Sequence, residues 1–241
     1  PITCPAHLSI LSGTSPATHG VFANGTVIPA DLPLLQEAFD ASGVPTAGFV
    51  AGYPVTSRFG FDRGFQVFDD DFGDGLGDHR LTVRRLIDQF VYARGAPRER
   101  SADQVLARAI PWIEAHADGG FFAWVHLFDP HGPYVAPAPF GESLAGALPP
   151  PVEGPEMPHY WPVRQRLVAD PDYWILRYDE EIAYTDDRLG VLLEVLEREG
   201  VLEDTLVAVI ADHGESLDEH DYYFDHGLHL YDASLRVPLI L

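Results

Sequence analysis

The chain has 241 residues, enough for one large domain or at most two small ones, and its 46% hydrophobic and 22% charged residues are ordinary for a globular fold. The formal net charge of −22 excludes a nucleic-acid surface, because a phosphate backbone must be neutralised by Lys and Arg side chains. No apolar run approaches the ~20 residues of a membrane-spanning helix, and a single cysteine excludes an internal disulfide. Because so acidic a chain would repel an anionic substrate, its charge favours a bound metal ion.

The first half of the sequence predicts helices that alternate with strands. Ser101 and Gln104 form a capping box, and the apolar residues after them repeat on one helical face. Pro111 should kink this helix or mark its irregular end. In chain order, the predicted elements are a helix over 34–42 that Gly43 ends, a strand over 46–51, the helix after Ser101 and a strand over 121–127.

The second half begins with a proline-rich excursion over 132–172, since ten of the 21 prolines lie between Pro133 and Pro171. A long helix is predicted from 173 to 199, with Gly200 as its end. A continuous apolar strand over 205–211 and a last strand over 236–241 follow. The inward face of the long helix should be apolar and consist of Ile175, Ile182, Leu189, Leu192, Leu193 and Leu196.

Strands separated by helices predict an α/β fold with a mostly parallel (mixed) sheet covered by helices on both faces. In such sheets, ligands bind beyond the carboxyl ends of the strands. Asp129 and His131 follow one predicted strand, and Asp212 and His213 follow another. These four residues should therefore share one rim of the sheet.

The first candidate site residue is Thr3. Pro5 favours the first turn of a helix and Gly13 favours its end, so a short helix should start near Pro5 with Thr3 at or just before its N-terminus. The free N–H groups at such a place attract an anion. A threonine there can also serve only as a helix cap.

Histidines and carboxylates form the other candidates. Asp212 and His213 offer a hard oxygen and an imidazole, which suit Zn²⁺, Mn²⁺ or a similar ion, although the same pair can simply form a polar turn. His131 could orient an anionic substrate or protonate a leaving group. Further histidines, among them His226, gather in the segment 220–229, where a single loop histidine is usually solvated.

Six short blocks of residues occur in one order along nearly the whole chain. They are Thr3-Cys4-Pro5-Ala6-His7 with Ser9 to Gly13 and Thr18-His19-Gly20-Val21; Gly60-Phe61-Asp62-Arg63-Gly64-Phe65 with Phe68-Asp69; His126 to Tyr134; Tyr178 to Ile182 with Asp186 and Leu189-Gly190; Asp212-His213-Gly214-Glu215; and Arg236 to Leu239. In this order the blocks resemble the sulfatase-like hydrolases of the alkaline phosphatase superfamily. Each block is weak alone, but the series is specific.

The resemblance implies a role for each matching position. Thr3 would be both the nucleophile and a metal ligand, and Asp212 and His213 would hold the same ion. The implied cofactor is a divalent metal ion: Zn²⁺, Mn²⁺ or Ca²⁺. His131 and His226 would line the pocket as catalytic residues. The residues that contact the substrate or support the ligands from behind would be His7, His19, Asp129 and Glu215.

One departure from the family bears on the function. The sulfatases of the family carry a cysteine, rarely a serine, two residues before the motif proline, and convert it to formylglycine. Here that position holds Thr3, while Cys4 is next to Pro5 and His7 takes the place of the family's arginine. A threonine cannot become the aldehyde, so direct attack by its hydroxyl on a phosphodiester or phosphonate ester is favoured. The alternatives are an arylsulfatase-like sulfuric ester hydrolase and a catalytically inactive relative that binds a metal or an anion.

The resemblance also implies parts that residues 1–241 should lack. Members of the family supply an acidic metal ligand from a first strand upstream of the nucleophile, and they have a smaller C-terminal subdomain. We therefore expect residues 1–241 to be one sulfatase-like catalytic domain without these two parts. The expected substrate is a small-molecule, glycan or lipid-headgroup ester, with no nucleic-acid partner and no membrane span in this segment.

Overall fold

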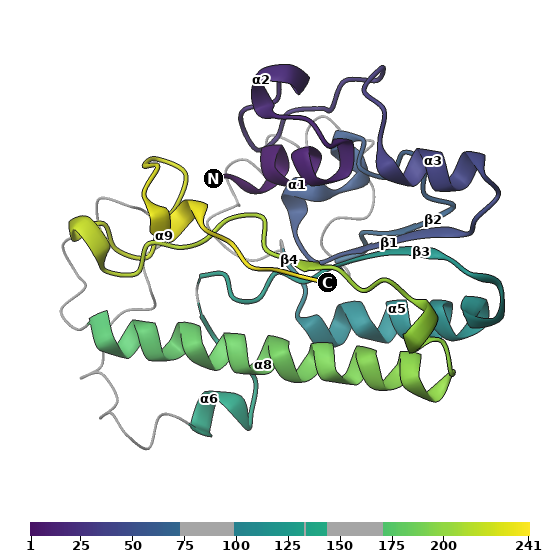
Figure 1. Ribbon diagram of the computed structural model, residues 1–241. Coiled ribbons are helices and arrows are strands. Elements are labelled where there is room, and N and C mark those ends of the chain that lie inside the picture. Colours follow the sequence, from purple (N-terminus) through teal and green to yellow (C-terminus); the bar gives the residue numbers. More distant parts are fainter. Residues whose placement is uncertain (73–98, 133, 144–170) are drawn as a thin grey trace, which may run out of the picture. The chain divides into compact units, whose positions relative to one another are not determined.

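The computed structural model describes residues 1–72, 99–132, 134–143 and 171–241. The chain forms two compact units: a terminal unit of residues 1–35 and 129–241, and a central unit of residues 36–128. Figure 1 labels their main helices and strands. Most of the proline-rich excursion expected over 132–172 lies outside the described residues.

The central unit is built on a parallel sheet. Its strands are β1 (Thr46–Val50), β2 (Val67–Asp69) and β3 (Phe122–His126), in the order β2-β1-β3. The middle strand β1 runs parallel to both neighbours, and all five of its residues are buried. The strands predicted over 46–51 and 121–127 are therefore confirmed, and so is the parallel arrangement.

Aromatic rings explain the glycine at the centre of β1. A Cβ atom on Gly48 would lie 2.7 Å from Cδ2 of Phe68. Phe65 is stacked against Trp124, with the ring centroids 6.0 Å apart, and Phe68 lies 6.5 Å from the same indole. Rings packed this closely over a strand leave no room for a side chain, so the position requires glycine.

Helix α5 (Ala102–His116) packs against β1 and β3. At its start, Gln104 Oε1 accepts a hydrogen bond of 3.0 Å from the N–H of Ser101, as the predicted capping box requires. The helix continues through Pro111 to His116, so Pro111 does not end it. The central unit is thus α/β, with helix and parallel sheet in contact, as the sequence predicts. The buried side of α5 consists of Ala102, Val105, Leu106, Ala109 and Ile113.

The terminal unit is mainly helical and holds a separate pair of short antiparallel strands, β4 (Val209–Ile210) and β5 (Leu239–Ile240). No helix in the described part of the chain is long and apolar enough to cross a membrane. The helices are α1 (Thr3–Ser12), α2 (Pro16–His19), α6 (Phe140–Ser143), α8 (Pro171–Arg198) and α9 (Asp232–Leu235), and α3 (Leu35–Ala41) spans the boundary between the units. Short 3-10 helices cover Tyr53–Val55, Ser57–Phe59, Ala117–Gly119, Leu202–Asp204 and Glu219–Asp221.

The strand predicted over 205–211 is much shorter in the structure, where β4 contains only Val209 and Ile210. Thr205 ends the preceding turn, with its N–H bonded to the carbonyl of Leu202 at 3.2 Å, and Leu206 is 79% exposed. The prediction of a long buried strand was wrong. An apolar run becomes a strand only where a neighbouring strand satisfies its backbone hydrogen bonds.

Helix α8 has the predicted length, and Gly200 follows it with a φ of 74°. Its buried face differs from the prediction, because Ile182 and Leu193 are exposed while Glu180 and Glu181 are buried. The apolar pattern failed here since both carboxylates have fixed partners, which remove the penalty that normally keeps a carboxylate at the surface. Glu180 is bonded to Arg177, and Glu181 accepts hydrogen bonds from backbone N–H groups.

Candidate active site

Thr3 is the first residue of α1 and is buried. Ile2, in extended conformation, occupies the N-cap position, so Thr3 does not cap the helix. The N–H of Cys4 donates to Asn24 Oδ1 at 2.8 Å, and Gly13 ends the helix with a φ of 66°. The sequence therefore holds a buried hydroxyl at the positive end of a ten-residue helix.

The segment after β4 brings Asp212 and His213 to this hydroxyl. Nε2 of His213 lies 3.5 Å from Oγ1 of Thr3 and 3.5 Å from Oδ2 of Asp212. His7 is four residues after Thr3 on α1, which places both side chains on one face of the helix. Its Nε2 lies 3.4 Å from the same Asp212 oxygen. Residues that are more than 200 positions apart in the sequence thus meet at one point.

The hydrogen bonds of His213 show which of its nitrogens can bind a ligand. Nδ1 lies 2.9 Å from the carbonyl oxygen of Gly214, which can only accept, so Nδ1 carries the proton and Nε2 keeps its lone pair. Burial lowers the pKa of His213 more than Asp212 raises it, which favours this neutral form. The lone pair of Nε2 can therefore accept the proton of the Thr3 hydroxyl, 3.5 Å away, or bind a cation.

These separations fit a divalent metal ion. Donors at ~2.1 Å from a tetrahedral ion lie ~3.4 Å from one another. The two separations from His213 Nε2, 3.5 Å to Thr3 Oγ1 and 3.5 Å to Asp212 Oδ2, are close to this value. Within the described ranges, no group of three or more His, Cys, Asp or Glu side chains is arranged to hold a metal. The set is partial, and the identity of the ion stays a prediction.

A second group of side chains surrounds His226. Its Nδ1 lies 3.2 Å from Glu215 Oε1, and the other oxygen of Glu215 accepts a hydrogen bond of 3.1 Å from the hydroxyl of Tyr134. Burial alone would lower the pKa of His226, but the hydrogen bond and the charge of Glu215 raise it overall. The ring of His226 lies 4.1 Å from that of His213, measured between centroids.

His131 lies beside this group, with its ring 5.7 Å from that of His226. Its Nδ1 is 2.9 Å from the carbonyl oxygen of Gly132, so Nε2 is the nitrogen available to a ligand. Burial, and then the charge of His226, lower the pKa of His131 to about 4. The imidazole is therefore neutral at pH 7 in the absence of an anion.

The structure brings together most of the predicted site residues: Thr3, His7, His131, Asp212, His213, Glu215 and His226. His19 contacts α1 further along the helix: its Nε2 is 3.1 Å from Ser9 Oγ, and its Nδ1 accepts from Val21 N–H at 3.1 Å, so it joins the chain after α2 to α1. Asp129 accepts a hydrogen bond of 3.2 Å through its carbonyl from Thr185. No role for Tyr134 was predicted from the sequence, although it belongs to the same block, His126 to Tyr134, as His131.

A change at Gly214 should disturb this geometry. A Cβ atom there would lie 2.0 Å from the carbonyl oxygen of Ala233, and the N–H of Gly214 donates to Ser234 at 3.0 Å. Gly214→Ala must therefore push the Asp212–His213 segment away from α9. We expect kcat/KM to fall about 100-fold, as for a misplacement of about 1 Å.

Gly190→Ala on α8 is the matched control. A Cβ atom on Gly190 meets nothing within 4 Å, and alanine favours a helix. Steady-state kinetics and thermal melting of both variants should show lost activity for Gly214→Ala alone, with the melting temperature of Gly190→Ala unchanged or raised. Equal activity in the two variants would show that the contact between Gly214 and α9 does not determine the position of Asp212 and His213.

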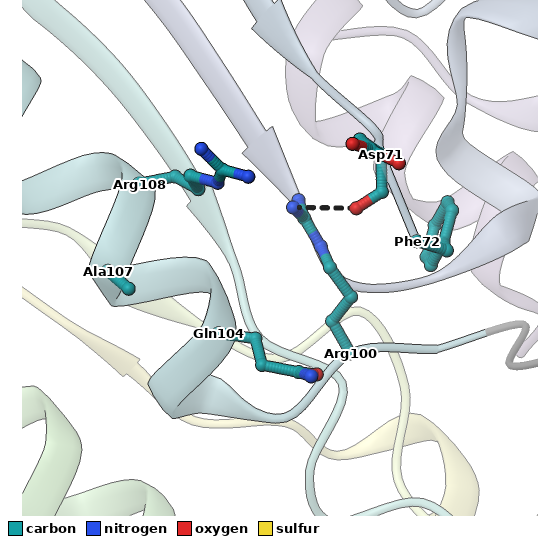
Figure 2. A pocket seen from close by; sticks show the side chains of 6 residues that line it. All are labelled: Asp71, Phe72, Arg100, Gln104, Ala107 and Arg108. Atoms are coloured by element: carbon teal, nitrogen blue, oxygen red, sulfur yellow. Dashed lines mark hydrogen bonds between the residues drawn. The ribbon is translucent and has the colours of Figure 1, made fainter. Parts of the chain in front are cut away.

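The central unit has a hollow of about 430 Å³ beside α5, lined by Asp71, Phe72, Arg100, Gln104, Ala107 and Arg108 (Figure 2). Arg100 uses all its N–H groups on the protein. They bond to the carbonyls of Val50, Asp69 and Asp71 and to the carboxylate of Asp69. A guanidinium without a free donor holds the end of the sheet together and offers nothing to a ligand.

Comparisons with known proteins show the family to which the chain belongs. Among solved structures, the chain is similar to a phosphonate monoester hydrolase of Agrobacterium radiobacter, with a TM-score of 0.68 and 19% identity over 98% of this chain and 57% of that one. The sulfatase family model matches residues 1–241, so the chain belongs to the sulfatase family. The predicted resemblance is confirmed.

Two curated relatives extend this finding. The chain is 24% identical to a choline-sulfatase of Rhizobium meliloti (strain 1021) over 280 aligned residues, which cover 100% of this chain and 53% of the relative. It is 29% identical over 160 residues to the multifunctional alkaline phosphatase superfamily protein PehA of Trinickia caryophylli, covering 56% of this chain and 30% of that protein. The chain thus spans about half of the first relative and less than a third of the second.

Proposed function

We propose that the protein is a metal-dependent enzyme that hydrolyses or transfers phosphodiesters or phosphonate monoesters with Thr3 Oγ1 as the nucleophile. One observation carries the proposal: the Thr3 hydroxyl starts α1 and lies 3.5 Å from Nε2 of His213, which is adjacent to Asp212. Sulfatase and phosphonate monoester hydrolase relatives support ester hydrolysis in general. The expected substrates are small molecules, glycans or lipid headgroups that carry such an ester.

Thr3, Asp212 and His213 would hold the divalent ion, and an acidic residue of the kind the family supplies would complete the set. Once bound, the ion would supply positive charge that lowers the pKa of the Thr3 hydroxyl and stabilises charge in the transition state. This role also agrees with the net charge of −22, because an anionic ester needs a local cation to approach so acidic a chain.

The proposed reaction has two displacements at phosphorus. In the first, Thr3 Oγ1 gives its proton to solvent and attacks, so that the Oγ1–P bond forms while the bond from phosphorus to the leaving alcohol breaks. Nε2 of His226, or of His131 once the bound anionic ester has caused its protonation, donates a proton to the departing oxygen, since Nδ1 of each ring is occupied by Glu215 or Gly132. In the second, water or an acceptor alcohol attacks phosphorus and returns a proton to that imidazole, while the Oγ1–P bond breaks and Thr3 Oγ1 takes a proton back from solvent.

The choice of phosphorus over sulfur follows from Thr3. A formylglycine hydrate expels sulfate by eliminating to the aldehyde, whereas a threonine ester has no such exit and depends on attack at the central atom. Cys4 does not replace it, because the thiol is fully buried and burial raises its pKa to about 11. Sulfate-ester hydrolysis is the second candidate, favoured by the family model and by the choline-sulfatase relative.

Matched substrates test this proposal. With the full-length protein and saturating metal, kcat/KM for an aryl phosphodiester or phosphonate monoester should exceed that for the matching aryl sulfate by at least about tenfold, or 1.4 kcal/mol of activation free energy. Thr3→Ala is the control that shows whether the turnover belongs to this site. A clear sulfate preference that Thr3→Ala abolishes would assign the second function, and metal binding without turnover of any of these esters would indicate an inactive relative.

A further inference from the structure

We infer that Glu181 on α8 is the positioning residue that sets both imidazoles of the active site through one backbone segment. The inference rests on the proposed function, in which His131 or His226 protonates the leaving oxygen. Neither the mechanism above nor the sequence pattern gives this carboxylate a role, and the helical pattern predicted apolar residues for the buried face of α8. The structure buries it to 4% exposure.

The contacts of Glu181 join α8 to the segment that carries His131. Its Oε2 accepts a hydrogen bond of 3.2 Å from the N–H of His131, and its Oε1 accepts one of 2.5 Å from the N–H of Val135. Hydrogen bonds to an ionised carboxylate are about twice as strong as neutral ones. One carboxylate that accepts hydrogen bonds from two backbone amides four residues apart holds both amides, and the residues that carry them, in place relative to α8.

That segment also carries Tyr134, which extends the influence of Glu181 to the second imidazole. The ring of Tyr134 is 2% exposed and packs against Phe224. Its hydroxyl donates to Glu215 at 3.1 Å, and Glu215 in turn accepts from Nδ1 of His226 at 3.2 Å. A displaced segment would therefore move His131 directly and would loosen the hydrogen bonds that hold His226.

The neighbouring Glu180 provides a matched comparison. It is fully buried on the same helix, but its carboxylate is 2.6 Å from Nη1 of Arg177, which also donates to the carbonyl of Gly141 in α6. The two adjacent carboxylates thus share burial and helix but have different partners. A general effect of removing a buried carboxylate should appear in both variants, whereas loss of imidazole positioning should appear only for Glu181.

The leaving-group dependence of kcat separates positioning from damage to the fold. For Glu181→Ala we expect kcat with an alkyl phosphodiester to fall about 100-fold, within the range of general acid catalysis, while kcat with a p-nitrophenyl phosphodiester falls only a few-fold because that leaving group needs little protonation. Glu181→Gln keeps one carbonyl acceptor and should lose less. Glu180→Ala should lower both rates by the same factor, if at all.

Amide hydrogen exchange provides a readout that does not need turnover. In Glu181→Ala and Glu181→Gln, protection of the His131 and Val135 amides should fall, and in Glu180→Ala it should stay as in the wild type. If no ester is turned over but this protection is lost, the proposed function fails. The role of Glu181 in holding the His131 and Val135 amides then still stands. Unchanged protection in Glu181→Gln, or an equal loss of kcat with both leaving groups, would overturn the inference.

Discussion

Replacing Thr3 by Ala should lower kcat by a factor on the order of 10⁴ or more with an aryl phosphodiester, the scale of loss when a covalent nucleophile is removed. The Thr3 hydroxyl lies 3.5 Å from His213 Nε2, and the alanine variant has no hydroxyl there to form the covalent intermediate. Rates measured at saturating metal separate this loss from the weaker metal binding that the missing ligand also causes.

Two variants control for other effects of the substitution. Thr3→Ser keeps a hydroxyl and should retain activity to within about 100-fold, the cost of a small misplacement. Cys4→Ala removes the adjacent thiol, which is buried and protonated at neutral pH, and should keep the wild-type rate apart from a modest loss of stability. Inactivity of Cys4→Ala in a folded protein, together with an active Thr3→Ala, would move the nucleophile to Cys4.

Replacing His213 should affect metal binding, whereas replacing His131 should affect turnover. His213→Ala removes the Nε2 donor beside Asp212, so the metal dissociation constant should rise more than about 100-fold. Loss of a residue that only supports a metal ligand costs up to about 100-fold in metal affinity, and loss of the ligand itself should cost more. His131→Ala should leave metal affinity within a few-fold and lower kcat about 10²- to 10⁴-fold. Metal titration by calorimetry, together with kinetics at saturating metal, measures both.

The division of roles fails if the two variants lose metal affinity equally. His229→Ala is a useful control, because this histidine belongs to the same segment as His226 but packs against Tyr222 and Tyr231. His229→Ala should change neither the metal affinity nor kcat by more than a few-fold.

Local signals in the sequence were enough for much of the fold. The capping box of Ser101 and Gln104, the glycines after α1 and α8, and the apolar run of β1 each depend on nearby residues, and the structure confirms them. The predicted strand over 205–211 failed because its extent depends on partners elsewhere in the chain. Among the described residues only β5 pairs with it, over two residues.

In the candidate site too, some positions could be predicted from the sequence, whereas those that depend on distant partners could not. The family resemblance predicted that Asp212 and His213 lie near Thr3. The strand pattern predicted instead that they share a rim of one parallel sheet with Asp129 and His131, but in the described part of the chain β4 pairs antiparallel with β5, apart from the parallel sheet of β1, β2 and β3. Tyr134 and Glu181 could not be found in this way. Their contacts join residues 81 and 50 positions apart, between Tyr134 and Glu215 and between Glu181 and His131, and no periodic pattern reports such pairs.

The contacts of His19 lie within the α1–α2 region. The family resemblance implies that His19 contacts the substrate or supports the ligands from behind, and its two ring nitrogens are used by Ser9 and Val21. A histidine with both nitrogens bonded to the protein contributes to the fold of that region, since it has no ring nitrogen left for a ligand.

The central claim is that Thr3 Oγ1 forms the covalent bond to the transferred group. The most direct test is rapid quenching of the full-length, metal-loaded enzyme during turnover of an aryl phosphodiester or phosphonate monoester, followed by mass spectrometry of its peptides. The account predicts that the peptide with Thr3 gains the mass of the transferred group in the wild type and that no adduct forms in Thr3→Ala. An adduct on another residue, or full turnover by Thr3→Ala, would contradict it.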